Sequence, residues 1–207
     1  MDGLAKEADL IEDALLTIAW DVDDVLNDLM RLWLEHAWRP ANPDCSVRYE
    51  DLNENPPNNI IGVKLEEYLT SLDSFRLSGI YDDMKPVEEI KDWFLVNGNK
   101  YRHIALTAVP IAAAPLSARW VFNNFGPWIR TFHFVPSSRE QERIPEYDKD
   151  KGEYLKWLGK VDVLIDDNET NIRAARTAGV RGILVPRPWN GCNNTLSESL
   201  AILGKEL

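Results

Sequence analysis

The sequence contains little cysteine and little histidine. Its 207 residues include two cysteines, Cys45 and Cys192, and three scattered histidines. Two distant cysteines without cysteine or histidine neighbours form neither a disulfide framework nor a zinc-binding motif. A chain of this length needs no such links, because it can bury a sufficient hydrophobic core. We therefore expect a single α/β domain, with room for a small inserted subdomain.

Long apolar runs are also missing. No segment approaches the ~20 apolar residues of a membrane-spanning helix, and the start, MDGLAKEADLIED, lacks the basic and apolar stretches of a signal peptide. Basic residues are in the minority, with 23 lysines and arginines against 34 aspartates and glutamates. Because binding to a polyanion needs clustered basic residues, we expect neither a nucleic-acid polymer nor a membrane as a partner. We expect a cytoplasmic protein and make no prediction of its oligomeric state.

Short apolar segments alternate with helical patterns. Five segments bounded by polar or turn residues predict strands that are buried on both faces: residues 16–20, 104–107, 131–135, 161–165 and 182–185. Apolar residues recur at helical spacing in the stretches between them: residues 26–37, 86–98, 110–125, 151–158 and 171–178. This alternation predicts an α/β fold with a doubly wound parallel sheet.

Residues 38–85 interrupt the alternation. They contain a proline- and asparagine-rich run at 54–59, followed by a helical pattern from Leu65 to Leu72. The stretch is too long for a plain crossover loop. We therefore predict a core domain made of residues 1–26 and 86–207, and a small helical cap made of residues 27–85. The role of residues 1–14 is not predicted.

Polar side chains follow four of the predicted strands. They are Asp21, Asp23 and Asp24 after the first strand, Thr107 at the end of the second, Ser137, Arg139 and Lys151 after the third, and Asp166 and Asp167 after the fourth. Ligands of open parallel sheets bind outside the carboxyl ends of the strands, so we expect these groups to lie along one edge. Crowded carboxylates repel one another unless a positive charge offsets them. Oxygen ligands without nearby cysteine or histidine favour a hard cation such as Mg²⁺.

Four segments, in this order, resemble the motifs of haloacid-dehalogenase-like phosphatases. They are the strand and Asp-x-Asp of Thr17–Leu26, the strand ending in threonine of Ile104–Ala108, Lys151, and the strand with paired aspartates of Val163–Asp167. Each motif is weak alone, but four in family order are specific. The resemblance covers roughly residues 14–190. It implies a haloacid-dehalogenase-like, Rossmannoid core with a cap, and the activity of a phosphoric monoester hydrolase.

The resemblance also implies roles for the two aspartates of the first motif. Asp21 would attack phosphorus and form an aspartyl-phosphate. Asp23 would protonate the leaving oxygen and then take a proton from the attacking water. Dehalogenases of this superfamily lack the second aspartate, because a halide leaving group needs no proton.

A magnesium ion and a phosphoryl group complete the implied site. Mg²⁺ would be held by the carboxylates of Asp21 and Asp166 and by the backbone carbonyl of Asp23, with Asp167 acting indirectly or through water. Three further residues would bind the phosphoryl group: Thr107, Ala108 and Lys151. We choose Lys151 over three nearby lysines, Lys149, Lys156 and Lys160, because Gly152 and a helical pattern follow it. We expect Asn171 to cap a helix.

A narrower resemblance concerns the substrate. The run Asp-Val-Asp-Asp-Val-Leu, the Ile-Asp-Asp strand end and Pro188-Trp189-Asn190 are similar to the 5'(3')-deoxyribonucleotidase-like branch, although Asp24 stands where that branch often has glycine. It implies a 5'- or 3'-(deoxy)nucleotide as the substrate. The cap aromatic Trp33 is a candidate substrate contact, because aromatic rings stack on nucleobases. Arg139 is a second candidate, as a contact to phosphate or to the cap.

Two alternatives stay open. The same residues suit a phosphatase for sugar phosphates or other small metabolites, and the cap decides between these substrates. A receiver-like phospho-acceptor module also combines an acceptor aspartate with Thr or Ser and Lys on an α/β sheet. Its acidic pair, however, ends the first strand and its acceptor ends a later one, whereas here Asp23 follows the acceptor Asp21 by two residues.

Overall fold

The computed structural model describes residues 15–137, 139, 145 and 147–205. Its centre is a five-stranded sheet in the order β3-β2-β1-β4-β5, in which all neighbouring strands are parallel. The strands are β1 (Thr17–Trp20), β2 (Arg102–Val109), β3 (Ile129–Pro136), β4 (Val163–Asp166) and β5 (Arg181–Leu184). The prediction of an α/β fold with a parallel sheet is confirmed, with longer second and third strands than the apolar runs indicated.

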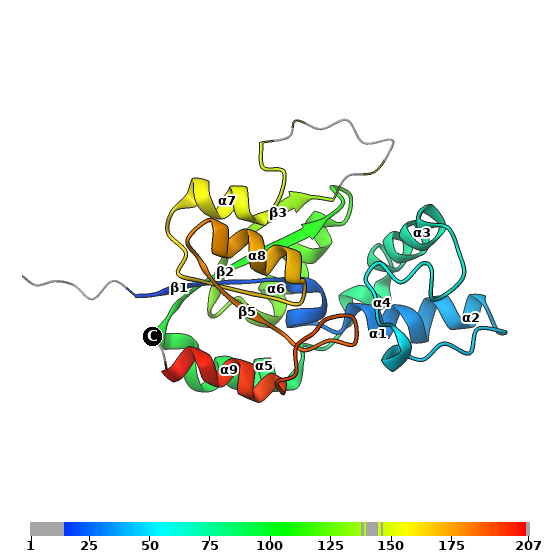
Figure 1. Ribbon diagram of the computed structural model, residues 1–207, viewed down its shortest axis with the longest axis horizontal. Helices are drawn as coiled ribbons and strands as arrows, with labels where there is room; N and C mark the ends of the chain where they lie inside the picture. Colours follow the sequence, from blue (N-terminus) through cyan, green and yellow to red (C-terminus); the bar gives the residue numbers. More distant parts are fainter. Residues whose placement is uncertain (1–14, 138, 140–144, 146, 206–207) are drawn as a thin grey trace, which may run out of the picture.

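Helices cover both faces of the sheet (Figure 1). Side chains of β1 alternate between two hydrophobic clusters, because Ile18 and Trp20 face one side and Ala19 faces the other. The first face packs against α5 (Glu88–Asn97), α6 (Ala114–Phe125) and α9 (Leu196–Lys205). The second packs against α7 (Lys151–Leu158) and α8 (Glu169–Thr177). The central strand is therefore fully buried, which explains its uninterrupted apolar sequence.

The residues of the predicted cap form a group of helices beside the carboxyl end of β1 (Figure 1). They are α1 (Leu29–Trp33), a helical continuation through Leu34–Trp38, α2 (Arg39–Ala41), α3 (Leu65–Arg76) and α4 (Gly79–Asp82). Aromatic rings fill the interior of this group, where Trp33 packs against Trp38 and Tyr68 at centroid distances of 5.5 and 5.2 Å. No helix in the described part of the chain combines the length and apolarity needed to cross a membrane.

Register brings the ends of three strands together. Trp20 of β1 lies beside Ala105 of β2 and Ile165 of β4. The residues that follow these positions therefore emerge at the same edge of the sheet, next to the cap.

Candidate active site

A tight loop follows β1 and carries the first two candidate residues. The backbone N–H of Asp21 donates to the carbonyl of Ile165 at 2.9 Å, so this residue continues the β1–β4 ladder. Asp24 then adopts a left-handed conformation with φ of 61°. This backbone region favours glycine, but aspartate tolerates it because its short side chain can bond locally. Here Asp24 Oδ1 accepts from the backbone N–H of Met30 at 2.9 Å. The predicted helix consequently begins only at Leu29.

Lys151 joins two of the candidate carboxylates. Its Nζ lies 2.8 Å from Asp21 Oδ1 and 2.7 Å from Asp166 Oδ2, and the residue is 1% exposed. Lys151 is the first residue of α7, and Asp150 caps this helix by accepting from the backbone N–H of Glu153. The lysines at 149, 156 and 160 are exposed to solvent. Of these four lysines, only Lys151 is buried among the candidate carboxylates.

Close packing of α7 against α8 sets the position of this lysine. A Cβ atom on Gly152 would lie 2.8 Å from the Cβ of Ala174 and 3.0 Å from its carbonyl oxygen. Glycine therefore allows the start of α7 to approach α8 more closely than any other residue would.

Three carboxylates meet beside this ammonium group. Oxygen atoms of Asp21, Asp166 and Asp167 lie within 4.8 Å of one another, and all three residues are buried. Asp166 accepts from the backbone N–H of Asn168 at 2.8 Å and from Asn171 Nδ2 at 3.1 Å. Asp167 accepts from Trp189 Nε1 at 2.7 Å. The donors fix the carboxylates in place, but they bring only one full positive charge to three negative ones.

The electrostatics of the cluster reflect this imbalance. Burial raises the pKa of Asp167 from 3.8 to about 8, and the negative charges of Asp166 and Asp24 add to the effect. Burial also raises the pKa of Asp21, although Lys151 counteracts it. Burial lowers the pKa of Lys151, but Asp166 and Asp21 outweigh this and raise it overall. The cluster has oxygen donors and excess negative charge, and these suit a hard divalent cation.

The cluster opens into a cavity of about 370 Å³ between the sheet edge and the cap. Thr107 Oγ1, at the end of β2, lines this cavity and is a buried atom without a hydrogen-bond partner among the described residues. A buried hydroxyl left unpaired is costly, so it indicates a bonding partner that enters the cavity. Ala108, Asp21 and Lys151 lie on the same wall.

The opposite wall belongs largely to the cap. Its apolar side chains are Leu29, Met30, Pro56, Leu65, Tyr68, Leu69 and Leu72. Polar groups on the remaining walls are Asn55, Arg76, Ser137, Arg139, Asn168 and Asn171. A larger groove of about 730 Å³ lies between α5 and α9 but contains none of the candidate groups. The chemistry therefore belongs to the smaller cavity.

Asp23 is bound by groups that the sequence did not indicate. Arg76 Nε and Nη2 donate to Asp23 Oδ2 at 3.1 and 3.0 Å. Tyr81 Oη and Asn27 Nδ2 donate to Oδ1 at 3.1 and 3.2 Å. Burial lowers the pKa of Arg76, but the Asp23 carboxylate outweighs this and raises it above the ordinary value.

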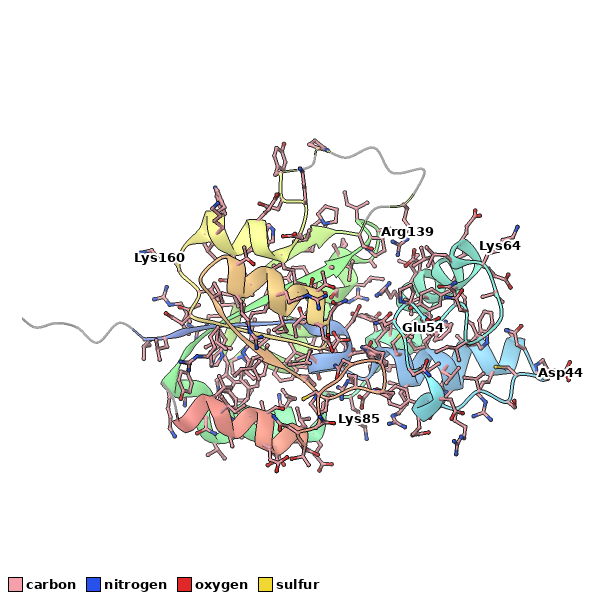
Figure 2. The ribbon with its side chains drawn as sticks, viewed as in Figure 1. Asp44, Glu54, Lys64, Lys85, Arg139 and Lys160 are labelled. Atoms are coloured by element: carbon pink, nitrogen blue, oxygen red, sulfur yellow. The ribbon has the colours of Figure 1, made fainter. Side chains whose placement is uncertain are left out.

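An ionic chain continues from Arg76 across the cap. Arg76 Nη1 donates to Asp73 Oδ1 at 3.2 Å, and Arg139 Nε donates to Asp73 Oδ2 at 2.7 Å. Figure 2 shows Arg139 on the side of the core that faces the cap helices. Arg139, a predicted substrate contact, therefore lines the cavity while it is bonded to Asp73.

Two expectations need correction. Trp33, the other predicted substrate contact, is fully buried inside the cap and is not among the cavity's described lining residues, because its indole N–H donates to Ser71 and its ring packs on neighbouring aromatics. Asn171 does not cap α8, since Asn168 does so by accepting from the backbone N–H of Thr170 at 2.8 Å. Asn171 instead supports Asp166.

Comparisons with known proteins identify the fold. No protein-family model matches the sequence, and no curated protein matches it significantly. Solved structures do match. One is a Thermotoga maritima protein provisionally described as a beta-phosphoglucomutase. Its sequence is 19% identical to this chain, and the match has a TM-score of 0.58 and covers 93% of this chain and all of the Thermotoga chain. A haloacid dehalogenase-like family hydrolase from Streptococcus pneumoniae is 13% identical, with a TM-score of 0.57 over 89% of this chain and 90% of that one. A predicted phosphatase from Clostridium acetobutylicum has the same identity and coverage and a TM-score of 0.56. The chain therefore has the haloacid-dehalogenase-like fold.

Proposed function

We propose that the chain is a phosphatase that hydrolyses a small phosphomonoester through an aspartyl-phosphate on Asp21. One observation carries this proposal: Lys151 joins Asp21 and Asp166 at the wall of a cavity that is also lined by the Thr107 hydroxyl, which has no hydrogen-bond partner in the described part of the chain. A nucleophilic carboxylate, an ammonium group and a free hydroxyl donor are the groups that phosphoryl transfer requires. The same fold in hydrolases and phosphatases supports the proposal.

Magnesium fits the donor set of this site. The carboxylates of Asp21, Asp166 and Asp167 converge within 4.8 Å and are too negative to be balanced by Lys151 alone. These groups and the backbone carbonyl of Asp23 would hold the ion. Bound there, Mg²⁺ would offset the negative charge of the carboxylates and of the phosphoryl group.

The chain's own residues would carry out two half-reactions. Val22 N–H and Lys151 both bond to Asp21 Oδ1, which leaves Oδ2 as the better nucleophile. Oδ2 forms a bond to phosphorus while the bond between phosphorus and the leaving oxygen breaks, and that oxygen takes a proton from Asp23. A water molecule then gives a proton to Asp23 and attacks the aspartyl-phosphate, which releases phosphate and restores Asp21. Lys151 and Thr107 position the phosphoryl oxygens throughout.

The cavity supports a compact substrate better than a nucleotide. Stacking of a nucleobase calls for aromatic rings on the cavity wall, but Tyr68 is the one aromatic among the described lining residues. Trp189 and Asn190, part of the resemblance to nucleotidases, bond to Asp167 and thus support the carboxylate cluster. We therefore favour a sugar phosphate or a similar metabolite. Names given to similar structures, a beta-phosphoglucomutase and a phosphoglycolate phosphatase, support this class.

The proposal is tested with purified protein, Mg²⁺ and a panel of sugar phosphates, nucleoside monophosphates and 4-nitrophenyl phosphate. We expect turnover of at least one small phosphomonoester, and its loss on Asp21→Asn with an unchanged circular dichroism spectrum. Asp44→Asn, at an exposed position in the cap, is the matched control. Substantial phosphatase activity of Asp21→Asn would refute the assignment. An aspartyl-phosphate that persists for minutes would instead favour a receiver-like acceptor.

A further inference from the structure

Among the described residues, the side chains that bond to the Asp23 carboxylate all come from the cap and its connections to the core. Arg76 ends cap helix α3, Tyr81 belongs to α4 just before the chain returns to the core, and Asn27 lies where the chain leaves it. All three donate to the carboxylate at 3.0 to 3.2 Å. The position of Asp23 is therefore coupled to the position of the cap.

These bonds occupy the carboxylate completely. A carboxylate offers about four acceptor positions, and Asp23 receives two bonds from Arg76 on Oδ2 and one each from Tyr81 and Asn27 on Oδ1. A proton on Oδ2 would face the N–H groups of a guanidinium, which has no acceptor. In this arrangement Asp23 cannot deliver a proton to a leaving oxygen.

Arg76 has a second anchor that allows it to change partners. Its Nη1 bonds to Asp73 Oδ1 at 3.2 Å, and Asp73 is held in turn by Arg139. Arg76 also lines the cavity that contains Asp21 and Thr107. A phosphoryl group placed on those residues would bring oxyanions beside the guanidinium and compete with Asp23 for it.

We propose that Arg76 is a positioning residue that withholds Asp23 until a phosphoryl oxygen of the substrate takes over its guanidinium. The inference rests on the proposed phosphatase function. Arg76 remains tied to Asp73 during the exchange. Asp23 Oδ2, released from the guanidinium, takes up a proton from solvent and passes it to the leaving oxygen. Acid catalysis is thereby restricted to the substrate-bound enzyme, and Arg76 contributes to substrate binding as well.

The test compares two substrates that differ in their need for an acid. Ethyl phosphate has a strongly basic leaving oxygen that must be protonated, whereas 4-nitrophenyl phosphate has a leaving group that needs little protonation. Arg76→Gln removes the guanidinium from Asp23. We expect the ratio of kcat for ethyl phosphate to kcat for 4-nitrophenyl phosphate to rise about tenfold, which is a fraction of the full 10²–10⁴-fold contribution of general acid catalysis. KM should rise for both substrates, because the phosphoryl group loses a donor.

Asp73→Asn provides the opposite perturbation. It removes the negative charge of the competing anchor and leaves Asp23 as the one carboxylate paired with Arg76 among the described residues, so the same kcat ratio should fall. Asp73 is partly exposed, with a side-chain exposure of 22%, and its replacement spares the buried Arg76–Asp23 pair. Arg119→Gln is the matched control, because it breaks an exposed ion pair with Asp82 of α4 and does not touch Asp23.

The kcat ratios decide whether Arg76 withholds Asp23 or has another role. A lower ratio in Arg76→Gln would mean that Arg76 holds Asp23 ready to react, and an equal loss with both substrates would mean a purely structural role; either result overturns the proposal. If Arg76→Gln does not fold, the ratio in Asp73→Asn decides: a fall supports the proposal, and an unchanged or higher ratio overturns it. Failure of the phosphatase function itself is separate, because it would appear as wild-type protein without turnover of 4-nitrophenyl phosphate.

Discussion

Trp20 donates its indole N–H to Nδ1 of His103 at 3.0 Å, across the junction of β1 and β2. The other ring nitrogen, Nε2, lies 2.8 Å from the carbonyl oxygen of Gly98 and donates to it. The imidazole is therefore neutral, with one accepting and one donating nitrogen. Burial lowers the pKa of His103 from 6.5 to about 4. The two rings pack with Trp93 and Phe94 of α5, so this bond lies in the core between the sheet and α5, on the strand that leads to Asp21.

The low pKa of His103 predicts acid sensitivity. The unfolded chain takes up a proton on this histidine below pH 6.5, whereas the folded chain does so only near pH 4. The free energy of unfolding should therefore fall as the pH drops from 6.5 to 4, by about 3 kcal/mol from this group. Urea unfolding at several pH values measures the loss. His103→Gln should lose less over this interval, while His36→Gln, at an exposed position, should behave like the wild type. Equal losses in all three proteins would contradict the prediction.

The carboxylate cluster predicts the opposite pH dependence for the metal-free protein. The pKa of Asp167 is about 8 when folded against 3.8 in the unfolded chain, so the folded state binds more protons between these values. This contribution to stability falls as the pH rises from 4 to 8. Magnesium would relieve the repulsion, so Mg²⁺ should raise the melting temperature more at pH 8 than at pH 5. Equal shifts at both pH values would count against metal binding by this cluster, as would hydrolysis that continues unchanged with a chelator.

Lys151 should be essential for activity. Lys151→Gln leaves Asp21 and Asp166 without their shared cation and removes a donor to the phosphoryl group. We expect kcat to fall by on the order of 10²–10³, as for the loss of other preorganised donors to developing charge. Lys156→Gln, on an exposed position of the same helix, should retain activity. Comparable kcat values for the two variants would exclude Lys151 from the phosphoryl site.

Gly152 should couple helix packing to catalysis. Gly152→Ala places a Cβ atom 2.8 Å from the Cβ of Ala174, so α7 must move away from α8. We expect a loss of about 1–3 kcal/mol in stability, as for other overpacked sites, together with lower kcat because Lys151 begins the displaced helix. Gly79→Ala meets no atom within 4 Å and is the control for thermal unfolding and turnover. A stable and fully active Gly152→Ala would show that the helices tolerate the shift.

The local pattern of apolar and polar residues made much of the core domain predictable. Short apolar runs between helical patterns indicated the parallel sheet, and the strand-end rule indicated that Asp21, Thr107 and Asp166 would lie near one another. These inferences need only the periodicity of the apolar residues and the common direction of the strands. Helix α9 was missed, because a short amphipathic stretch near the chain end resembles many exposed segments until its partner α5 is known.

Partners of the site residues were less predictable. Arg76 is separated from Asp23 by more than fifty residues, and nothing in the spacing links a cap arginine to the loop after β1. Asn171 was assigned to helix capping, but Asn168 occupies that position; the two asparagines lie one helical turn apart, so either could have been the cap. Trp33 was assigned to the substrate because it lies in the cap, yet its ring fills the cap interior. Such contacts depend on tertiary packing, which sequence periodicity does not specify.

The central position of β1 in the sheet affects how the chain can fold during synthesis. Its apolar strand is synthesised before its two hydrogen-bonding neighbours, which begin at Arg102 and Val163. Until both have been synthesised, the strand lacks the partners that cover its edges, a state that is slow to resolve and prone to self-association. Nascent chains that end before residue 163 should therefore depend on chaperones, and they should be inactive because they also lack Asp166 and Asp167.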